Sequence, residues 1–279
     1  MKKIIAAFDG LRFSESTMLY AIDIAKMSGS HIVGVFLDDI TYTSYKIYDL
    51  VAEEGTSQAL LNSYDLKDKI AREKAAIAFN SACNKAGVSH AIHHDRNIAL
   101  HELIHESVYA DLLIIDKKET LTYYVENLPT RFVKDLLADV QCPVLLVPEI
   151  YHPVTTVVFL YDGEPSSVYA IKMYDYVLNK STSTVAVVVS VRGKDDAVSV
   201  PDKYLLKEFL QRHFQDIEYK LFQGDSATEI NSFLKKQSED TLVVAGSYHR
   251  SSVSRWLRPS IADSLMKELK LPLFIAHSK

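Results

Sequence analysis

The residues best suited to chemistry in this sequence lie in a polar and basic segment that runs from Gly246 to Ser260. A Val-rich apolar run precedes the segment, and apolar residues at helical spacing follow it. A strand, a glycine-led loop and a helix start form the arrangement that holds phosphate in nucleotide-binding α/β domains, because loop N–H groups and the positive end of the helix dipole face the anion. His249 and Arg250 could add charge-assisted contacts. The segment therefore predicts a phosphate-binding loop, against the plainer interpretation of a solvated basic loop whose Trp256 packs on the helix.

A second candidate is the sequence His101-Glu-Leu-Ile-His105, which matches the HExxH pattern of zinc peptidases. On a helix the two imidazoles lie one turn apart on one face, with the glutamate placed as a base. No Gly-x-x-His continuation supplies a third ligand, which would have to come from Glu119 or Glu126. Histidines in the preceding strand segment make a structural or adventitious metal a further interpretation. A polar helix face explains the same residues without any metal.

Nucleophilic catalysis is not predicted. The sequence has no Gly-x-Ser-x-Gly elbow, and neither Cys83 nor Cys142 has a recognisable base beside it. We therefore expect no catalytic residues and at most weak nucleotide hydrolysis. The formal net charge of −5 argues against a nucleic-acid-binding protein. The two cysteines in apolar settings, the missing signal-peptide pattern and the absence of an apolar run of membrane-spanning length predict a cytoplasmic protein.

Apolar runs and helical spacing alternate along the chain, and they predict strands that alternate with helices. In the first half we expect strands at 2–8, 31–37, 89–94, 111–115 and 142–147, with helices at about 15–28, 65–86, 98–109 and 130–139. In the second half we expect strands at 156–160, 184–189, 217–222, 241–245 and 273–276, with helices at about 166–179, 201–214, 227–236 and from 260.

The two halves repeat one another. Asp111 and Cys142 stand 129 residues before Asp240 and Leu271, whereas the Asp-Gly pair at 9–10 stands 153 residues before the pair at 162–163. The first half therefore carries about 24 additional residues, most naturally near 40–64. Repetition at this scale predicts two tandem domains, which we place at 1–150 and 154–279 on a short linker.

The alternation also predicts the fold class and the position of a site. Strands that alternate with helices imply right-handed crossovers, so each half should be an α/β Rossmann-like domain with a five-stranded parallel sheet and helices on both faces. Ligands of such sheets bind at the carboxyl ends of strands one and four. These ends carry Asp9, Gly10 and Lys117 in the first half and Asp162, Gly163 and Gly246 in the second. We also expect the halves to form an intramolecular pseudo-dimer, with a homodimer as an open alternative.

Strands that end in Asp-Gly and are followed by serines, as in FDGLRFSES and YDGEPSSVYA, resemble those of universal stress proteins. The resemblance covers nearly the whole chain as two tandem copies, and it implies an adenine-nucleotide α-hydrolase-like fold. Nucleotide-binding members of that family carry Gly-x2-Gly-x9-Gly-[Ser/Thr] after strand four. In this chain the second half has Gly246, His249, Pro259 and Ser260 at these positions. The first half has Lys117, Thr120, Thr130 and Arg131.

The resemblance implies ATP or AMP as the ligand, with Asp162 at the base or ribose and with Asp9 as its counterpart in the first half. Only two of the four loop positions match in the second half, and none matches in the first. His249 adds a side chain where glycine lets backbone approach a phosphate, and Pro259 removes an N–H donor. Two alternatives therefore remain beside a nucleotide-responsive regulator. One is a scaffold that binds an unidentified protein through the pseudo-dimer surface, and the other is a metal-binding protein.

Overall fold

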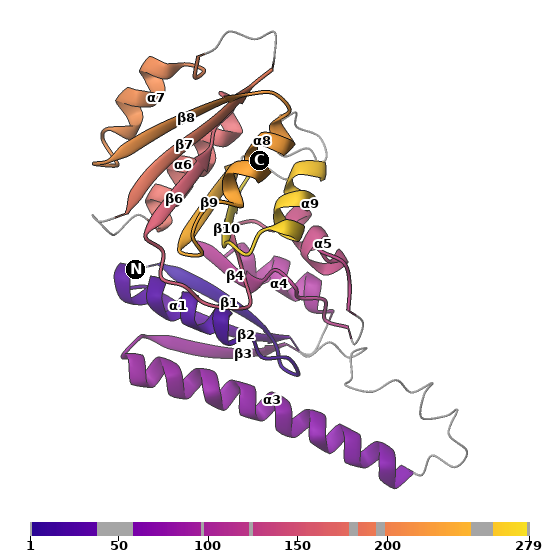
Figure 1. Ribbon diagram of the computed structural model, residues 1–279. Helices are drawn as coiled ribbons and strands as arrows, with labels where there is room; N and C mark the ends of the chain where they lie inside the picture. The colour runs from indigo at the N-terminus through magenta and orange to yellow at the C-terminus, as the bar shows by residue number, and fades with distance from the viewer. Residues whose placement is uncertain are drawn as a thin grey trace. The chain divides into compact units, whose positions relative to one another are not determined.

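The computed structural model describes residues 2–37, 58–95, 98–122, 125–178, 184–193, 199–246 and 259–277. The chain divides into two compact units, Met1–Gln141 and Cys142–Lys279 (Figure 1). Strands and helices alternate through both units, and all but one of the strand pairings described below are parallel. The predicted α/β fold class is therefore confirmed.

The first unit contains four strands in the order β3-β2-β1-β4, and all of their pairings are parallel. Its elements are β1 (Lys3–Asp9), α1 (Glu15–Ser28), β2 (His31–Leu37), α3 (Gln58–Ala86), β3 (His90–Asp95), α4 (Ala99–Ser107), β4 (Leu112–Asp116) and α5 (Arg131–Asp139). Helix α1 contacts α3, and α4 contacts α5. Right-handed crossovers place these two pairs on opposite faces of the sheet.

The second unit contains six strands in the order β5-β10-β9-β6-β7-β8. Its elements are β5 (Val144–Val147), β6 (Thr156–Leu160), α6 (Pro165–Val177), β7 (Val185–Arg192), α7 (Lys203–Leu210), β8 (Ile217–Gln223), α8 (Ser226–Leu234), β9 (Thr241–Gly246), α9 (Pro259–Glu268) and β10 (Leu273–Ala276). Strand β5 is the fifth strand of the first repeat, yet it pairs antiparallel with β10. The sequence repeat and the compact units therefore differ by this one strand.

Each unit buries a cluster of aromatic rings beneath its helices. In the first unit Phe8 stacks on Phe13 and Phe36, with ring centroids 5.0 and 5.1 Å apart. Gly34 of β2 lets Phe79 of α3 approach, because a Cβ at this glycine would lie 2.7 Å from the Phe79 ring. The second unit uses other residues for the same purpose, namely Phe159, Tyr174, Phe214 and Phe274. The cores bury apolar area, which is the main stabilising contribution, and they hold the strand ends in place.

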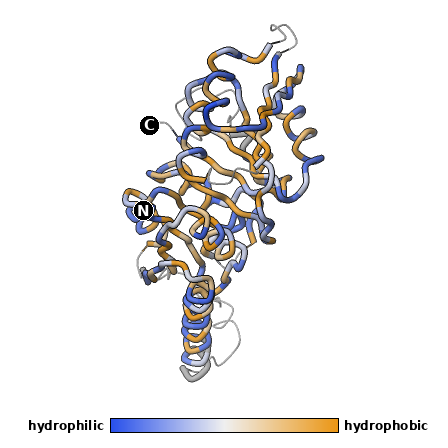
Figure 2. The backbone as a smooth tube through the Cα atoms, turned by 90° about the vertical axis from the view of Figure 1, so that its left-hand side faces the viewer, coloured by the Kyte–Doolittle hydropathy of each residue, from blue (hydrophilic) through white to orange (hydrophobic). Residues whose placement is uncertain are grey.

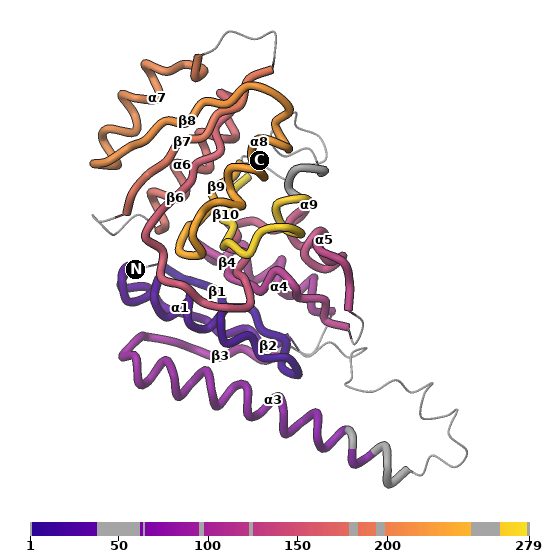
Figure 3. Tube along the Cα trace, in the orientation of Figure 1, coloured from indigo at the N-terminus to yellow at the C-terminus, as the bar shows by residue number. Residues whose placement is uncertain are grey.

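Two helices differ from the sequence-based expectation (Figure 3). Helix α3 begins at Gln58, seven residues before the predicted start at 65. Helix α7 covers only Lys203–Leu210 of the predicted 201–214, because Asp202 has a φ of 43° and turns and bends follow Leu210. Residues 40–57 of the predicted insertion lie outside the described residues. No helix in the described part of the chain is long and apolar enough to cross a membrane.

Candidate functional site

The carboxyl ends of neighbouring parallel strands bring the predicted site residues together in each unit. Strand β1 pairs with β4 in the first unit, and β6 pairs with β9 in the second. Asp9 ends β1, and Lys117 follows β4 directly. Asp162 and Gly163 follow β6, and Gly246 ends β9. The two edges have the same topology, but their side chains make different contacts.

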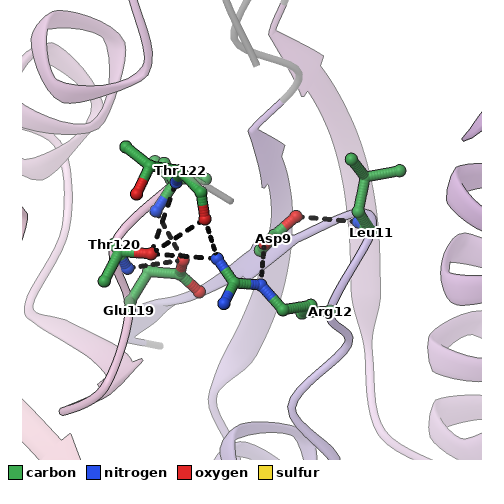
Figure 4. A network of polar contacts seen from close by, with 7 residues as sticks. Asp9, Leu11, Arg12, Glu119, Thr120 and Thr122 are labelled. Carbon is green, nitrogen blue, oxygen red and sulfur yellow. Dashed lines mark hydrogen bonds and ion pairs between the residues drawn. The ribbon is translucent and has the colours of Figure 1, made fainter. Parts of the chain in front are cut away.

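In the first unit Arg12 bridges the two strand ends (Figure 4). Asp9 is only 1% exposed. One of its carboxylate oxygens accepts a hydrogen bond from Leu11 N at 2.7 Å, and the other lies 3.3 Å from Arg12 Nε. The same guanidinium donates to Thr120 Oγ1 at 2.9 Å and to the backbone oxygen of Thr122. Arg12 thus ties the β1 end to the loop that follows β4.

The side chain of Glu119 accepts hydrogen bonds from two backbone N–H groups of that loop. Its Oε1 accepts hydrogen bonds from Thr120 N and Leu121 N, both at 2.9 Å, although the side chain is buried. Two successive backbone N–H groups that converge on one oxygen form an anion-binding nest. Here the nest holds a carboxylate of the protein itself. Burial, together with the charge of nearby Asp9, raises the pKa of Glu119 to about 7.

Residues beside this network are also engaged by the protein's own groups. Asp116 accepts a hydrogen bond from Ser14 Oγ at 3.1 Å, and Ser14 caps α1 by accepting from Thr17 N. Lys117 is 7% exposed. The Thr130 hydroxyl caps α5 and donates to the Glu119 backbone oxygen at 2.5 Å. The three predicted residues of this half, Asp9, Gly10 and Lys117, are all buried.

In the second unit the acidic residue lies in a tight turn. Asp162 accepts a hydrogen bond from Glu164 N at 2.9 Å, and burial raises the pKa of its carboxyl. Gly163 has a φ of 90°, and a Cβ at this position would lie 2.6 Å from Pro201 Cβ. Burial and the charges of Asp202 and Asp162 raise the pKa of Tyr161 to about 12. The charges of two carboxylates, Asp162 and Asp202, therefore both affect the buried tyrosine that follows β6.

Gly246 has a packing reason for lacking a side chain. A Cβ at Gly246 would lie 2.2 Å from the Ser166 backbone oxygen and 2.8 Å from Ser167 N, both in the first turn of α6. Backbone cannot give way as a flexible side chain can, so only glycine fits here. Of the other predicted residues of this half, Ser260 lies in the first turn of α9. His249 and Arg250 lie outside the described residues.

Comparison with known proteins places this geometry in a family context. No protein-family model matches the chain. The chain is 22% identical to the universal stress protein Slr1230 of Synechocystis over 98% of its own length and 99% of that protein. Its structure is similar to that of a universal stress protein from Archaeoglobus fulgidus, with a TM-score of 0.66, 14% identity, and coverage of 99% of this chain and 96% of that one. This chain resembles the tandem universal stress proteins over its whole length.

Two structures from Pseudomonas aeruginosa show the same fold. One is a putative universal stress protein, with a TM-score of 0.54, 14% identity, and coverage of 99% of this chain and 93% of that chain. The other is the protein PA1789, described as functionally unknown, with a TM-score of 0.57, 14% identity, and coverage of 99% and 92%. The tandem universal stress resemblance expected from the sequence is thereby confirmed.

Within this universal-stress-type fold, sequence reasoning did not indicate Arg12 and suggested Glu119 only as a metal ligand. It singled out strand ends and glycines, whereas the contacts of the first unit depend on an arginine three residues after Asp9 and a glutamate two residues after Lys117. A charge of opposite sign in the turn after an acidic strand end was a usable signal for Arg12. No local pattern marks Glu119, because its role depends on a carboxylate that folds back onto its own loop.

The histidine pair of α4 gains no third ligand among the described residues. His101 and His105 are exposed, and no group of three or more potential ligands capable of holding a metal occurs in the described ranges. The third ligands considered from the sequence have other contacts, since Glu119 binds its own loop and Glu126 accepts from Arg131 N at 2.7 Å. The neighbouring His93 lies 2.5 Å from Glu106.

Proposed function

We propose that this universal-stress-type protein is a cytoplasmic regulator that binds an adenine nucleotide, ATP or AMP, through its second unit. The proposal rests on the contrast between the two strand-end sites. In the first unit an arginine and a glutamate of the protein occupy the groups that would meet a ligand. At the repeat-related positions of the second unit the sequence has Pro165 and Tyr248.

These two replacements favour a ligand in the second unit. Pro165 begins α6 and has neither the charge nor the length to bridge Asp162 to the opposite loop. Tyr248 brings no carboxylate to neutralise loop N–H groups. In the proposed complex Asp162 and Gly163 lie at the base or ribose, Gly246 and Ser260 lie at the phosphates, and His249 and Arg250 supply positive charge. The helix dipole of α9 adds to the attraction for an anion.

A second candidate function is an interaction protein that binds no nucleotide and acts through the surface of its pseudo-dimer. The two glycines of the second site favour this alternative, because both have packing reasons. Gly246 lies against the backbone of α6, and Gly163 lies under Pro201. Neither residue therefore requires a phosphate to explain it.

Calorimetric titration of the full chain with ATP, ADP and AMP, with and without Mg²⁺, separates the two functions. We expect binding that Asp162→Asn and Ser260→Ala each weaken, because one substitution removes a carboxylate and the other a hydroxyl. The matched control is Arg131→Ala, which alters the exposed first-unit residue that is repeat-related to Ser260 and should leave the affinity unchanged. A Gly246 variant is unsuitable, because an added Cβ would clash with α6. No heat with any nucleotide would overturn the proposal and leave the interaction protein.

A further inference from the structure

Helix α3 is far longer than its counterpart in the second unit. It has 29 residues, whereas α7 has 8. Among its described side chains, the buried apolar ones, Ala75, Ala76, Phe79 and Cys83, lie in the C-terminal half, and Asp68 is a buried polar residue of the N-terminal half. The N-terminal half runs past the ends of β2 and β3 (Figure 1). This half is therefore not needed to cover the sheet of its own unit.

Three large aliphatic side chains of α3 are exposed on one face. Leu66 is 57% exposed, Ile70 is 40% exposed and Ile77 is 67% exposed. Spacings of four and seven residues place them along one side of a helix. Figure 2 shows hydrophobic and hydrophilic segments mixed along this helix. An aliphatic stripe on a protruding helix is typical of a helix-pairing surface.

The charges beside the stripe indicate which partner it fits. Glu73 and Lys74 stand midway between Ile70 and Ile77. Glu73 is exposed and lies 4.0 Å from Lys69 of the same helix. We propose that α3 pairs antiparallel with α3 of a second copy of this chain. In this register Ile70 faces Ile77 of the second copy, and Glu73 faces Lys74 of the second copy, so each contact occurs twice about a two-fold axis.

Other registers are less favourable because they oppose like charges. Parallel, in-register pairing places Glu73 against Glu73. An antiparallel register that sets Leu66 opposite Ile77 places Lys69 opposite Lys74. Only the proposed register combines an aliphatic pair with an opposite-charge pair among these three. The inference goes beyond nucleotide binding, because it uses none of the residues of the second-unit site.

Sedimentation velocity over a series of protein concentrations, on nucleotide-free full-length chain, tests the pairing. We expect a monomer–dimer equilibrium that Ile70→Glu abolishes. The matched control is Leu205→Glu on α7, which alters another exposed aliphatic residue and should leave the equilibrium unchanged. Circular dichroism checks that each variant keeps its helix content.

Exchanging the charges of Glu73 and Lys74 is the decisive test of the pairing. Glu73→Lys alone and Lys74→Glu alone should each raise the dimer Kd by roughly tenfold through like-charge repulsion. The double variant Glu73→Lys/Lys74→Glu should restore the wild-type Kd, which a purely structural effect on the helix would not do. A wild-type chain that stays monomeric at all concentrations, or a double variant as weak as the singles, would overturn the proposal. Neither result bears on nucleotide binding, so the two proposals fail independently.

Discussion

The two units place an acidic residue after the first strand of the repeat, but the surroundings of that residue differ. In the first unit Asp9 is paired with Arg12, and Glu119 binds the opposite loop. In the second unit Asp162 lies in its own turn, and Gly246 packs on helix backbone. A shared topology therefore fixes where a site can form, while a few side chains decide whether the protein's own groups occupy it.

The largest expected effect is that of Gly246→Ala in the second unit. The new Cβ would lie 2.2 Å from the Ser166 backbone oxygen, so β9 and α6 must move apart. We expect the free energy of unfolding to fall by about 3 kcal/mol or more, measured by chemical denaturation. Gly29→Ala is the control, because Gly29 has a positive φ of 63° but open space around it, so only the backbone cost of about 1 kcal/mol is expected. Equal losses for both variants would contradict the packing explanation.

Removal of Arg12 is the next largest change, and it tests whether the first unit depends on its internal bridge. Arg12→Ala leaves buried Asp9 near Glu119 with one cation fewer. Breaking a buried pair is costly, but the Arg12 side chain is 47% exposed, so we expect a loss of about 2 kcal/mol in the free energy of unfolding. Arg131→Ala removes the surface pair with Asp135 and should change it by under about 0.5 kcal/mol.

The pH dependence of stability sharpens the contrast further. The pKa of Glu119 is raised from an ordinary value of 4.5 to about 7 in the folded chain. Between these values the folded chain holds a proton that the unfolded chain has released, so this group lowers stability as pH rises through that window. In Glu119→Gln the amide oxygen can still accept the two N–H bonds. The variant should therefore match wild type near pH 4 and exceed its melting temperature above pH 7.

Glu106 of the same unit provides the control of opposite sign. Burial opposes ionisation of Glu106, but hydrogen bonds from Lys3 and His93 hold the pKa of its carboxyl below the usual value. This group adds stability above its unfolded pKa and loses it as pH falls through the folded pKa. Glu106→Gln should therefore be less stable than wild type at neutral pH, with the difference shrinking in acid. Thermal unfolding followed across pH would contradict both assignments if the two variants shifted in the same direction.

The sequence predicted the alternation of strands and helices well, but it predicted the side-chain contacts poorly. Val-rich runs such as Thr241–Gly246 are set by local pattern, so the α/β fold and the tandem repeat followed from periodicity. The apolar last strand of each half suggested that these strands pair, but the antiparallel direction of the β5–β10 pairing did not follow from local pattern, because it joins segments far apart in the chain. The sequence singled out Gly246 at the end of its strand. It could not show why glycine is needed there, because the close approach of α6 depends on tertiary packing.

The smallest expected effect concerns the start of the helix that follows each loop. Thr130 caps α5 in the first unit, and the residue 129 positions later is Pro259, which has no hydroxyl. Thr130→Ala removes the bond to Val133 N and the bond to the Glu119 backbone oxygen, so we expect a loss of about 1–2 kcal/mol. Thr130→Ser keeps the oxygen and should recover most of this stability. If chemical denaturation shows that serine is no better than alanine, the methyl group rather than the hydroxyl holds this loop, and the two units differ there in packing rather than in capping.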